Sequence, residues 1–247
     1  MLHVFLFATV LAVGGDSVRA GEDIVRAMHD RYAGKWYETL ALVQTVNYYD
    51  AETGAYDSAR VWYESIQLPG VVRSDVAPLD AGNRFLYKDE TWYDFRADTV
   101  YSAQPGPHPL LLLGFDVYVQ PVEETIAKLE QFRIDVSKVR EDEWQGRGVY
   151  VVGSSSADDD SRQFWVDKEH LLFVRLLLTD PSTKQTREVR FEGYERLGGG
   201  WIATEIVFMR GDRSTMVEQY NYWTIDVEFD PSLFTDTKGT RPKWVRN

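Results

Sequence analysis

The residues that could do chemistry in this chain are few and lie far apart. The 247 residues include no cysteine and four histidines, of which His29, His108 and His170 lie beyond the first 20 residues. No two of them have the H-x-x-x-H spacing that places two imidazoles of a helix on one metal ion. Without cysteine there is no disulfide, thiol nucleophile or thiolate-bound metal. We therefore expect no metal centre and no cofactor.

The chain also lacks the short motifs of common enzyme classes. It has no G-x-S-x-G nucleophile turn, no GxxxxGK[ST] phosphate loop and no GxGxxG dinucleotide loop. The acidic stretch Asp158–Asp160 lacks the alternating spacing of a calcium loop, so we expect a solvated hairpin loop there. An enzyme that acts on lipids would need a pair of polar side chains inside its binding cavity. Glu205, however, falls on the solvent-facing side of its strand, and Asp167 lies next to a turn. The sequence therefore predicts no catalytic residue and no enzyme.

The composition narrows the classes of partner. Lys and Arg number 27 against 39 Asp and Glu, which gives a net charge of −12. So acidic a surface repels phosphate backbones and anionic membranes, and nucleic acid is excluded as a partner. Hydrophobic residues make up 44% of the chain, enough for a packed core. With no linker-like stretch and no repeat, residues 21–247 are expected to form one domain.

The N-terminus predicts where the protein works. Residues 2–13 form an apolar run, and small residues lead to a cleavage site after Ala20. The alternative is an uncleaved membrane anchor, but a bilayer needs about 20 apolar residues and this run is shorter. We expect residues 1–20 to be a signal peptide and the mature chain to lie outside the cytoplasm.

Hydrophobic periodicity predicts a mostly β fold. Residues 22–32 show helical spacing and end at Gly34. The period then changes to two, with short turns between the runs. The predicted strands are 35–50, 59–67, 84–89, 91–96, 148–154, 164–169, 171–179, 186–197, 201–210 and 216–225. Short connections make neighbours antiparallel, and a sheet of about ten strands must curl or close.

Two helical segments interrupt this meander. Residues 108–118 form an apolar run opened by Pro109, and residues 121–132 alternate at helical spacing. A curled sheet has one concave face for them to cover. The apolar parity of the strands gives the floor of that face: Phe85, Tyr87, Tyr93, Phe95, Leu172, Val174, Leu176, Val189, Phe191, Ile202, Ile206 and Phe208. These residues either form a filled core or line a cavity for a ligand, and the pattern alone fits both.

The order of several motifs resembles the Lol-type periplasmic carriers of outer-membrane lipoproteins. The motifs are Q-T-V at 44–46, L-P-G at 68–70, P-L-L-L-L-G at 109–114, FWVDKEHLLFVRLLL at 164–178 and the run at 217–234 ending in D-P-S-L-F. The resemblance implies a half-open β-barrel of about eleven strands, lidded by helices, that binds acyl chains. It departs from the family at Leu68, where the carriers typically have an arginine tied to lid contacts, so this chain resembles a divergent member.

The resemblance and the pattern together predict a monomeric periplasmic carrier that shuttles a lipoprotein or lipid between membranes. An inner-membrane transporter and an outer-membrane acceptor are the partners that the resemblance implies. The expected lid residues are Leu110, Leu111, Leu112, Leu113 and Phe115. The alternative is an envelope-stress sensor or regulatory binding module of the same fold, with a protein or peptide partner.

Overall fold

The fold is described from a computed structural model that covers residues 18–157, 160–235 and 242–245. Most of the predicted signal peptide, residues 1–17, lies outside the described residues, and its cleavage stays a prediction. Asp158 and Asp159 of the acidic stretch lie outside them as well. Within the described part, no helix combines the length and the apolar character needed to cross a membrane.

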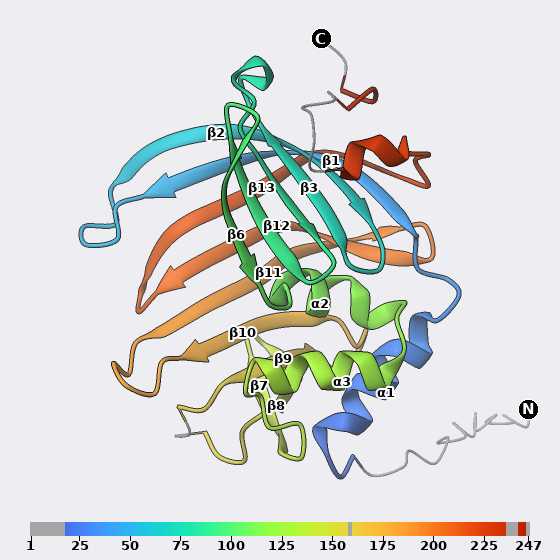
Figure 1. The fold of residues 1–247 in the computed structure, drawn as a ribbon. Coiled ribbons are helices and arrows are strands. Elements are labelled where there is room, and N and C mark those ends of the chain that lie inside the picture. The colour runs from blue at the N-terminus through green and yellow to red at the C-terminus, as the bar shows by residue number, and fades with distance from the viewer. Residues whose placement is uncertain (1–17, 158–159, 236–241, 246–247) are drawn as a thin grey trace, which may run out of the picture.

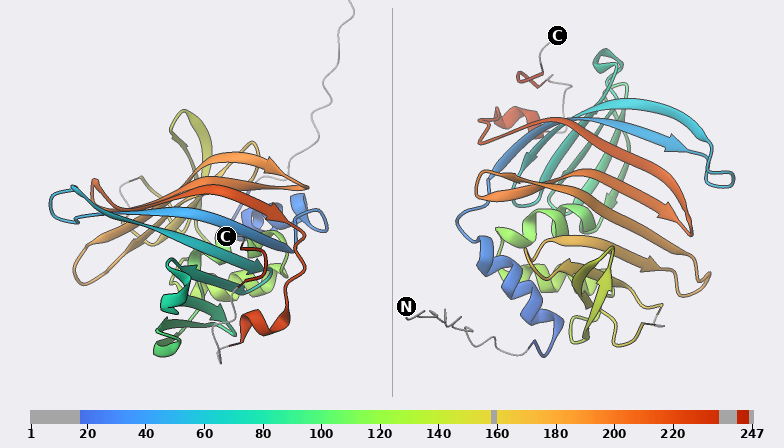
Figure 2. Two further views of the ribbon diagram at one scale, coloured as in Figure 1. Left: turned by 90° about the horizontal axis from the view of Figure 1, so that it is seen from above. Right: turned by 180° about the vertical axis from the view of Figure 1, so that it is seen from behind.

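Thirteen described strands form a single antiparallel sheet in the order β6-β5-β4-β3-β2-β1-β13-β12-β11-β10-β9-β8-β7 (Figure 1). The strands are β1 (Thr39–Tyr49), β2 (Tyr56–Gln67), β3 (Val71–Val76), β4 (Arg84–Lys88), β5 (Thr91–Arg96), β6 (Thr99–Pro105), β7 (Val139–Trp144), β8 (Arg147–Val152), β9 (Gln163–Asp167), β10 (Phe173–Thr179), β11 (Thr186–Leu197), β12 (Gly200–Arg210) and β13 (Arg213–Ile225). The chain therefore runs from the centre of the sheet to one edge, crosses to the other edge, and returns to pair β13 with β1. The edge strands β6 and β7 do not pair with each other, and the sheet stays open (Figure 2).

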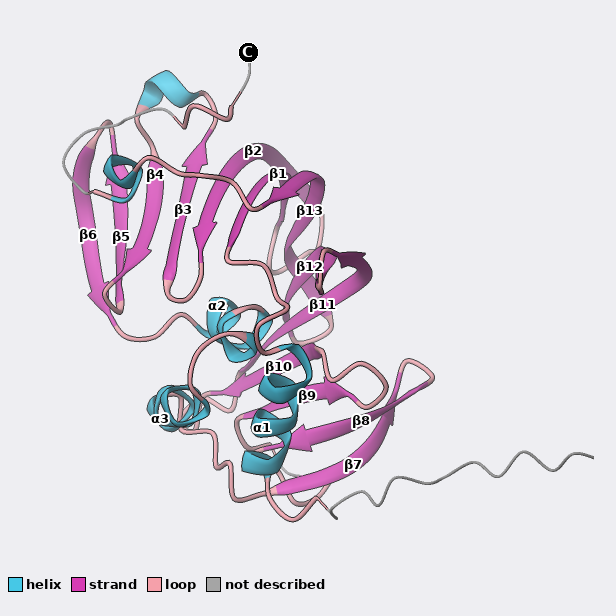
Figure 3. Cartoon of the chain, turned by 90° about the vertical axis from the view of Figure 1, so that its right-hand side faces the viewer, coloured by secondary structure: helices cyan, strands magenta, loops and turns pink. Residues whose placement is uncertain are grey.

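The helices lie inside the bend of the sheet (Figure 3). They are α1 (Gly21–Tyr32), α2 (Pro109–Gly114) and α3 (Val122–Gln131), together with the 3-10 turn η2 (Asp116–Tyr118). Two further 3-10 turns, η1 (Leu79–Ala81) and η3 (Pro231–Phe234), lie outside this group. The crossing from β6 to β7 is made by α2, η2 and α3, so the topology itself carries these segments across the concave face. The predicted architecture, one curled antiparallel sheet that stays open and carries short helices, is confirmed.

Three strands of the structure were not predicted. Strands β6 and β7 lie at the two edges of the sheet. Strand β7 has the sequence V-R-E-D-E-W, and charged side chains on an edge strand prevent it from pairing with other chains. Strand β3 contains a buried ion pair between Arg73 and Asp75, with Nη2 and Oδ1 2.7 Å apart. Charged residues at buried positions hide the period-two pattern, so the sequence showed no strand there.

The main hydrophobic core fills the space between the helices and the concave face. Ile24, Val25 and Met28 of α1 are buried in it, as the helical spacing of residues 22–32 predicts. The ring of Trp36 stacks on that of Tyr118 with centroids 4.0 Å apart. The helices thus occupy one part of the concave face, toward β7–β10.

Two smaller clusters lie on the convex face. Leu86 and Phe95 pack against Leu233 and Phe234 of η3. The other cluster lies toward β7 and consists of Val149, Val151, Trp165 and Val174. The sheet is therefore apolar on both faces at these places, and a simple division into a wet side and an apolar side does not hold for every strand.

Candidate ligand-binding cavity

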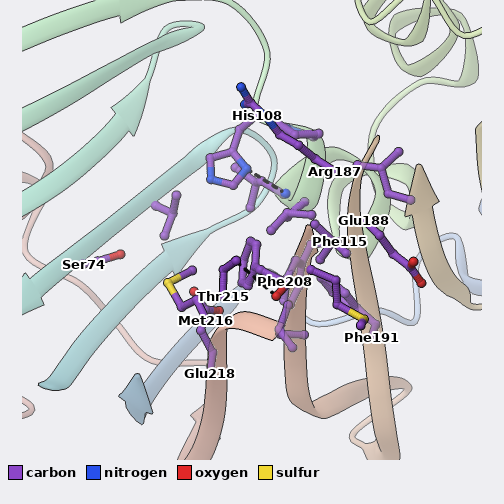
Figure 4. A pocket seen from close by; sticks show the side chains of 18 of the residues that line it. Ser74, His108, Phe115, Arg187, Glu188, Phe191, Phe208, Thr215, Met216 and Glu218 are labelled. Carbon is purple, nitrogen blue, oxygen red and sulfur yellow. Dashed lines mark hydrogen bonds between the residues drawn. The ribbon is translucent and has the colours of Figure 1, made fainter. Parts of the chain in front are cut away.

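A cavity of about 420 Å³ lies between the concave face of the sheet and α2 (Figure 4). Ligand pockets of proteins commonly have volumes of about 300 to 1,000 Å³. Its apolar lining consists of Trp62, Ile66, Val72, Trp92, Pro109, Leu110, Leu111, Phe115, Leu176, Leu178, Val189, Phe191, Ile206, Phe208, Met209 and Met216. The helices therefore leave part of the concave face unfilled, and what remains is lined mainly by hydrocarbon and aromatic rings.

Several predicted residues meet at this cavity. From the predicted floor, five residues line it: Leu176, Val189, Phe191, Ile206 and Phe208. From the predicted lid, three residues line it: Leu110, Leu111 and Phe115. They come from β10, β11, β12, α2 and Phe115 directly after α2, which the sheet register and the crossing bring together.

Other predicted residues are buried elsewhere in the main core. Tyr87, Leu172 and Ile202 belong to the main core but do not line the cavity, and Phe85 lies beside it, with its ring 5.3 Å from that of Trp62. Leu112 and Leu113 of α2 are likewise core residues, 2% and 0% exposed. One side of α2 faces the cavity and the other anchors the helix.

The expected face of Tyr93 and Phe95 needs correction. Both lie in the convex cluster beneath η3, while Tyr87 belongs to the main core. The reason is the two-residue turn at Asp89 and Glu90, where φ is 49° and 50°. Such a turn pairs Tyr87 with Trp92, an odd position with an even one, so the parity of the concave face reverses between β4 and β5. Trp92 therefore lines the cavity in place of Tyr93.

Val174 is corrected for a different reason. The register between β9 and β10 shifts between Phe173 and Arg175, which marks a β-bulge. A bulge inserts one extra residue into a strand and changes which side the following residues face. Val174 consequently packs on the convex face with Trp165, while Leu176 returns to the concave face.

The start of α2 is fixed by His108. The backbone N–H of Leu111 donates to Nδ1 of His108 over 3.1 Å, which caps the helix ahead of Pro109. The backbone N–H of His108 donates to the hydroxyl of Tyr87 over 3.1 Å. Desolvation lowers the pKa of His108 to about 4, so the imidazole is neutral at physiological pH. This histidine ties the start of α2 to β4, and no group that could hold a metal ion is found among the described residues.

The turn after α2 is tied to the L-P-G loop at residues 68–70. The backbone N–H of Gly70 donates to Oδ1 of Asp116 over 3.0 Å. Burial raises the pKa of Asp116 to about 7. Leu68, at the position where the resemblance implies an arginine, is 8% exposed and packs in the main core. The loop therefore contacts the segment after α2 through a backbone amide, and its Leu68 side chain is buried in the main core.

Three glutamates line the cavity; Glu188 pairs with Arg175 and Arg190, and the other two were not predicted at this site. Glu64 of β2 and Glu218 of β13 line it together with Ser74. Oε1 of Glu64 accepts from the hydroxyl of Ser74 over 2.6 Å and from Nε2 of Gln44 over 3.2 Å. Burial raises the pKa of Glu64 to about 7, and burial together with the charge of Glu64 raises that of Glu218. In their neutral form both are compatible with an apolar ligand.

A signal for these two residues does exist in the sequence. Glu64 is two residues from Trp62 and from Ile66, and Glu218 is two residues from Met216 and from Tyr220, so each glutamate shares a strand face with apolar or aromatic neighbours. A single glutamate on the apolar parity of a strand faces the same side as its apolar neighbours. By contrast, Glu205 accepts from Nε2 of Gln219 over 3.1 Å at an exposed position, on the wet side as predicted.

Similar folds occur in solved structures. An outer membrane lipoprotein-sorting protein domain from Vibrio parahaemolyticus matches with a TM-score of 0.57 and 13% identity, covering 87% of this chain and 95% of that chain. The chain has the LolA-like fold. A DUF1329 family protein from Desulfovibrio piger has a TM-score of 0.55, 17% identity and coverage of 87% and 95%. A LolA superfamily protein from Nitrosomonas europaea has a TM-score of 0.52, 14% identity and coverage of 88% and 98%.

The comparisons by sequence are less informative. A family model described only as an uncharacterized protein matches residues 123–238. No curated protein matches the chain. At identities of 13 to 17%, the likeness establishes the LolA-like fold alone.

Proposed function

We propose that this protein is an exported carrier that binds the acyl chains of a lipid or lipoprotein in the cavity under α2. The observation that carries the proposal is the unfilled, mainly apolar space of about 420 Å³ on the concave face. A purely structural domain would be expected to fill this space with its own side chains. A protein that carries hydrocarbon chains through water requires an apolar cavity to hold them.

The energetics of acyl transfer support this function. Burial of one methylene group is worth about 0.8 kcal/mol, so a chain of about 14 carbons gains on the order of 10 kcal/mol before ordering costs. A carrier must offer comparable apolar contact and still release its cargo. The lining of hydrocarbon and aromatic side chains provides the contact. The similarity of the fold to an outer membrane lipoprotein-sorting protein domain also supports a carrier role for this chain.

The lid has one fixed side and one cavity side. Leu112 and Leu113 hold α2 in the core, and Asp116 ties the following turn to Gly70. Leu110 and Leu111 face the cavity near the start of the helix. We propose that cargo enters where α2 begins, by movement of the segment around His108 and Leu110, while the end of the helix stays in place.

Phe208→Glu tests the cavity directly. Phe208 lines the cavity and is only half-buried, so a charged side chain there leaves the fold intact and places a carboxylate against the acyl chain. Native mass spectrometry of the exported protein should show bound lipid in the parent and little or none in the variant. Tyr222→Glu is the matched control. Tyr222 is 59% exposed, and the substitution adds the same charge away from the cavity.

Equal lipid content in Phe208→Glu and the parent would contradict the proposal. A parent protein that carries no lipid, binds no fatty-acid probe and retains a protein partner in pull-down would also contradict it. That last result would instead support a sensor or regulatory module.

A further inference from the structure

Two arginines lie at one end of the cavity. Arg187 of β11 and Arg210 of β12 both line it, and the register of the two strands places them directly opposite each other. In Figure 4 the side chain of Arg187 points from its strand toward the side of the cavity where His108 lies. Both arginines are exposed at the rim. The cavity therefore has a cationic end.

Neither arginine has a carboxylate partner. Of the described residues, none forms an ion pair with Arg187 or Arg210. Glu188, the next residue along β11, also lines the cavity, but its carboxylate already accepts from Nε of Arg175 over 2.7 Å and from Nε of Arg190 over 2.5 Å. Like charges directly opposite each other on neighbouring strands destabilise a sheet. In a chain with a net charge of −12, an uncompensated pair of this kind is a place where an anion would be stabilising.

The pairing of β11 with β12 gives the order of the cavity residues from the arginines inward. Residues that share a face are two apart, which is about 7 Å along a strand. Val189 and Phe208 follow the arginines as one opposed pair, and Phe191 and Ile206 follow as the next. Glu218 lies opposite Ile206 on the adjacent strand. Glu218 is therefore level with the second of these apolar rows, about 13 Å along the strands from the two arginines.

We infer that the ligand is an amphiphile with an anionic head, a carboxylate or a phosphate, which binds Arg187 and Arg210 while its hydrocarbon tail runs inward along the apolar rows. The inference rests on the proposed function and names the class of ligand. Guanidinium groups present paired N–H donors that match the oxygens of either head group. The acidic surface repels an extended anionic membrane, but two arginines at a rim can bind the head group of a single molecule.

The test compares ligands that share one tail. Dodecanoic acid, dodecyl phosphate and 1-dodecanol have the same chain and differ in the head group, and inorganic phosphate has the head alone. Their affinities for the parent and for the double variant Arg187→Gln/Arg210→Gln are measured by displacement of a fluorescent fatty-acid probe. Arg190→Gln is the control, because Arg190 lies on the same strand and pairs with Glu188.

We expect the parent to bind both anionic amphiphiles about tenfold more tightly than the alcohol, a preference that salt weakens. The double variant should lose this preference and still bind 1-dodecanol as the parent does, while Arg190→Gln should keep it. Inorganic phosphate should bind far more weakly than dodecyl phosphate. Equal binding of acid, phosphate and alcohol by the parent would overturn the anionic head and leave the carrier role standing. Failure of all three amphiphiles to bind would overturn both.

Discussion

The substitution Glu64→Gln should stabilise the protein at neutral pH and have little effect at low pH. Glu64 is 9% exposed, and burial raises the pKa of its carboxyl from 4.5 to about 7. Because the folded pKa lies above the unfolded value, the folded state binds the extra proton between these two pH values. Stability is therefore fully present below pH 4.5 and is lost as the pH rises toward 7.

The size of the effect follows from the two pKa values. Each pH unit between them corresponds to about 1.4 kcal/mol, which gives a loss of about 3 kcal/mol in the free energy of unfolding of the parent. The glutamine can still accept from Ser74 and has no charge to desolvate. Removal of Glu64 also removes the charge that raises the pKa of Glu218, and this acts in the same direction.

Urea denaturation of the parent and of Glu64→Gln at pH 4.5 and pH 8 measures this difference. The stability of the variant relative to the parent should increase by about 3 kcal/mol between the two pH values. Glu205→Gln serves as the control, because Glu205 is hydrogen-bonded to Gln219 at an exposed position. A relative stability of Glu64→Gln that does not change with pH would refute the argument that Glu64 is buried and desolvated.

Two further predictions concern the lid. Leu112→Ala should lower the free energy of unfolding in urea by about 2 to 5 kcal/mol, since Leu112 is 2% exposed, and Leu110→Ala should lower it less; equal losses would contradict the division of α2 into a core side and a cavity side. Asp116→Ala removes the acceptor for Gly70 and should speed release of a fluorescent fatty acid severalfold in stopped-flow experiments, whereas an unchanged rate would show that this hydrogen bond does not restrain the lid.

Much of the fold could be predicted because most neighbouring strands are joined by short turns. Alternation along 186–197 and 201–210 predicts β11 and β12 closely, and only one connection in the sheet is long. The elements that were missed are those where polar residues replace the alternation. In β7 the charged side chains prevent the sheet edge from pairing with other chains. In β3 the buried side chains of Arg73 and Asp75 form an ion pair with each other.

The site was harder to predict because facing depends on turns and bulges as well as on parity. One two-residue turn reverses the parity of β5, and one bulge turns Val174 outward. A register known only from the structure was also needed to see that Arg187 and Arg210 face each other. Glu64 and Glu218 could have been noticed as acidic residues on apolar parities, although the sequence does not show that β2 and β13 flank the same strand, β1.

The charges at the two ends of the cavity also determine how an amphiphile can lie in it. An anionic head would be repelled by Glu64 and Glu218 whenever either carboxyl is ionised, and in their neutral form it would still have to be desolvated at the inner end. At the rim the head keeps its contact with water and meets Arg187 and Arg210. The tail, in contrast, loses nothing by lying beside neutral carboxyl groups. The arrangement therefore favours entry of the tail first, and it ties tight binding to the protonated state of the two glutamates, so affinity for a hydrocarbon tail should fall as the pH rises above about 7.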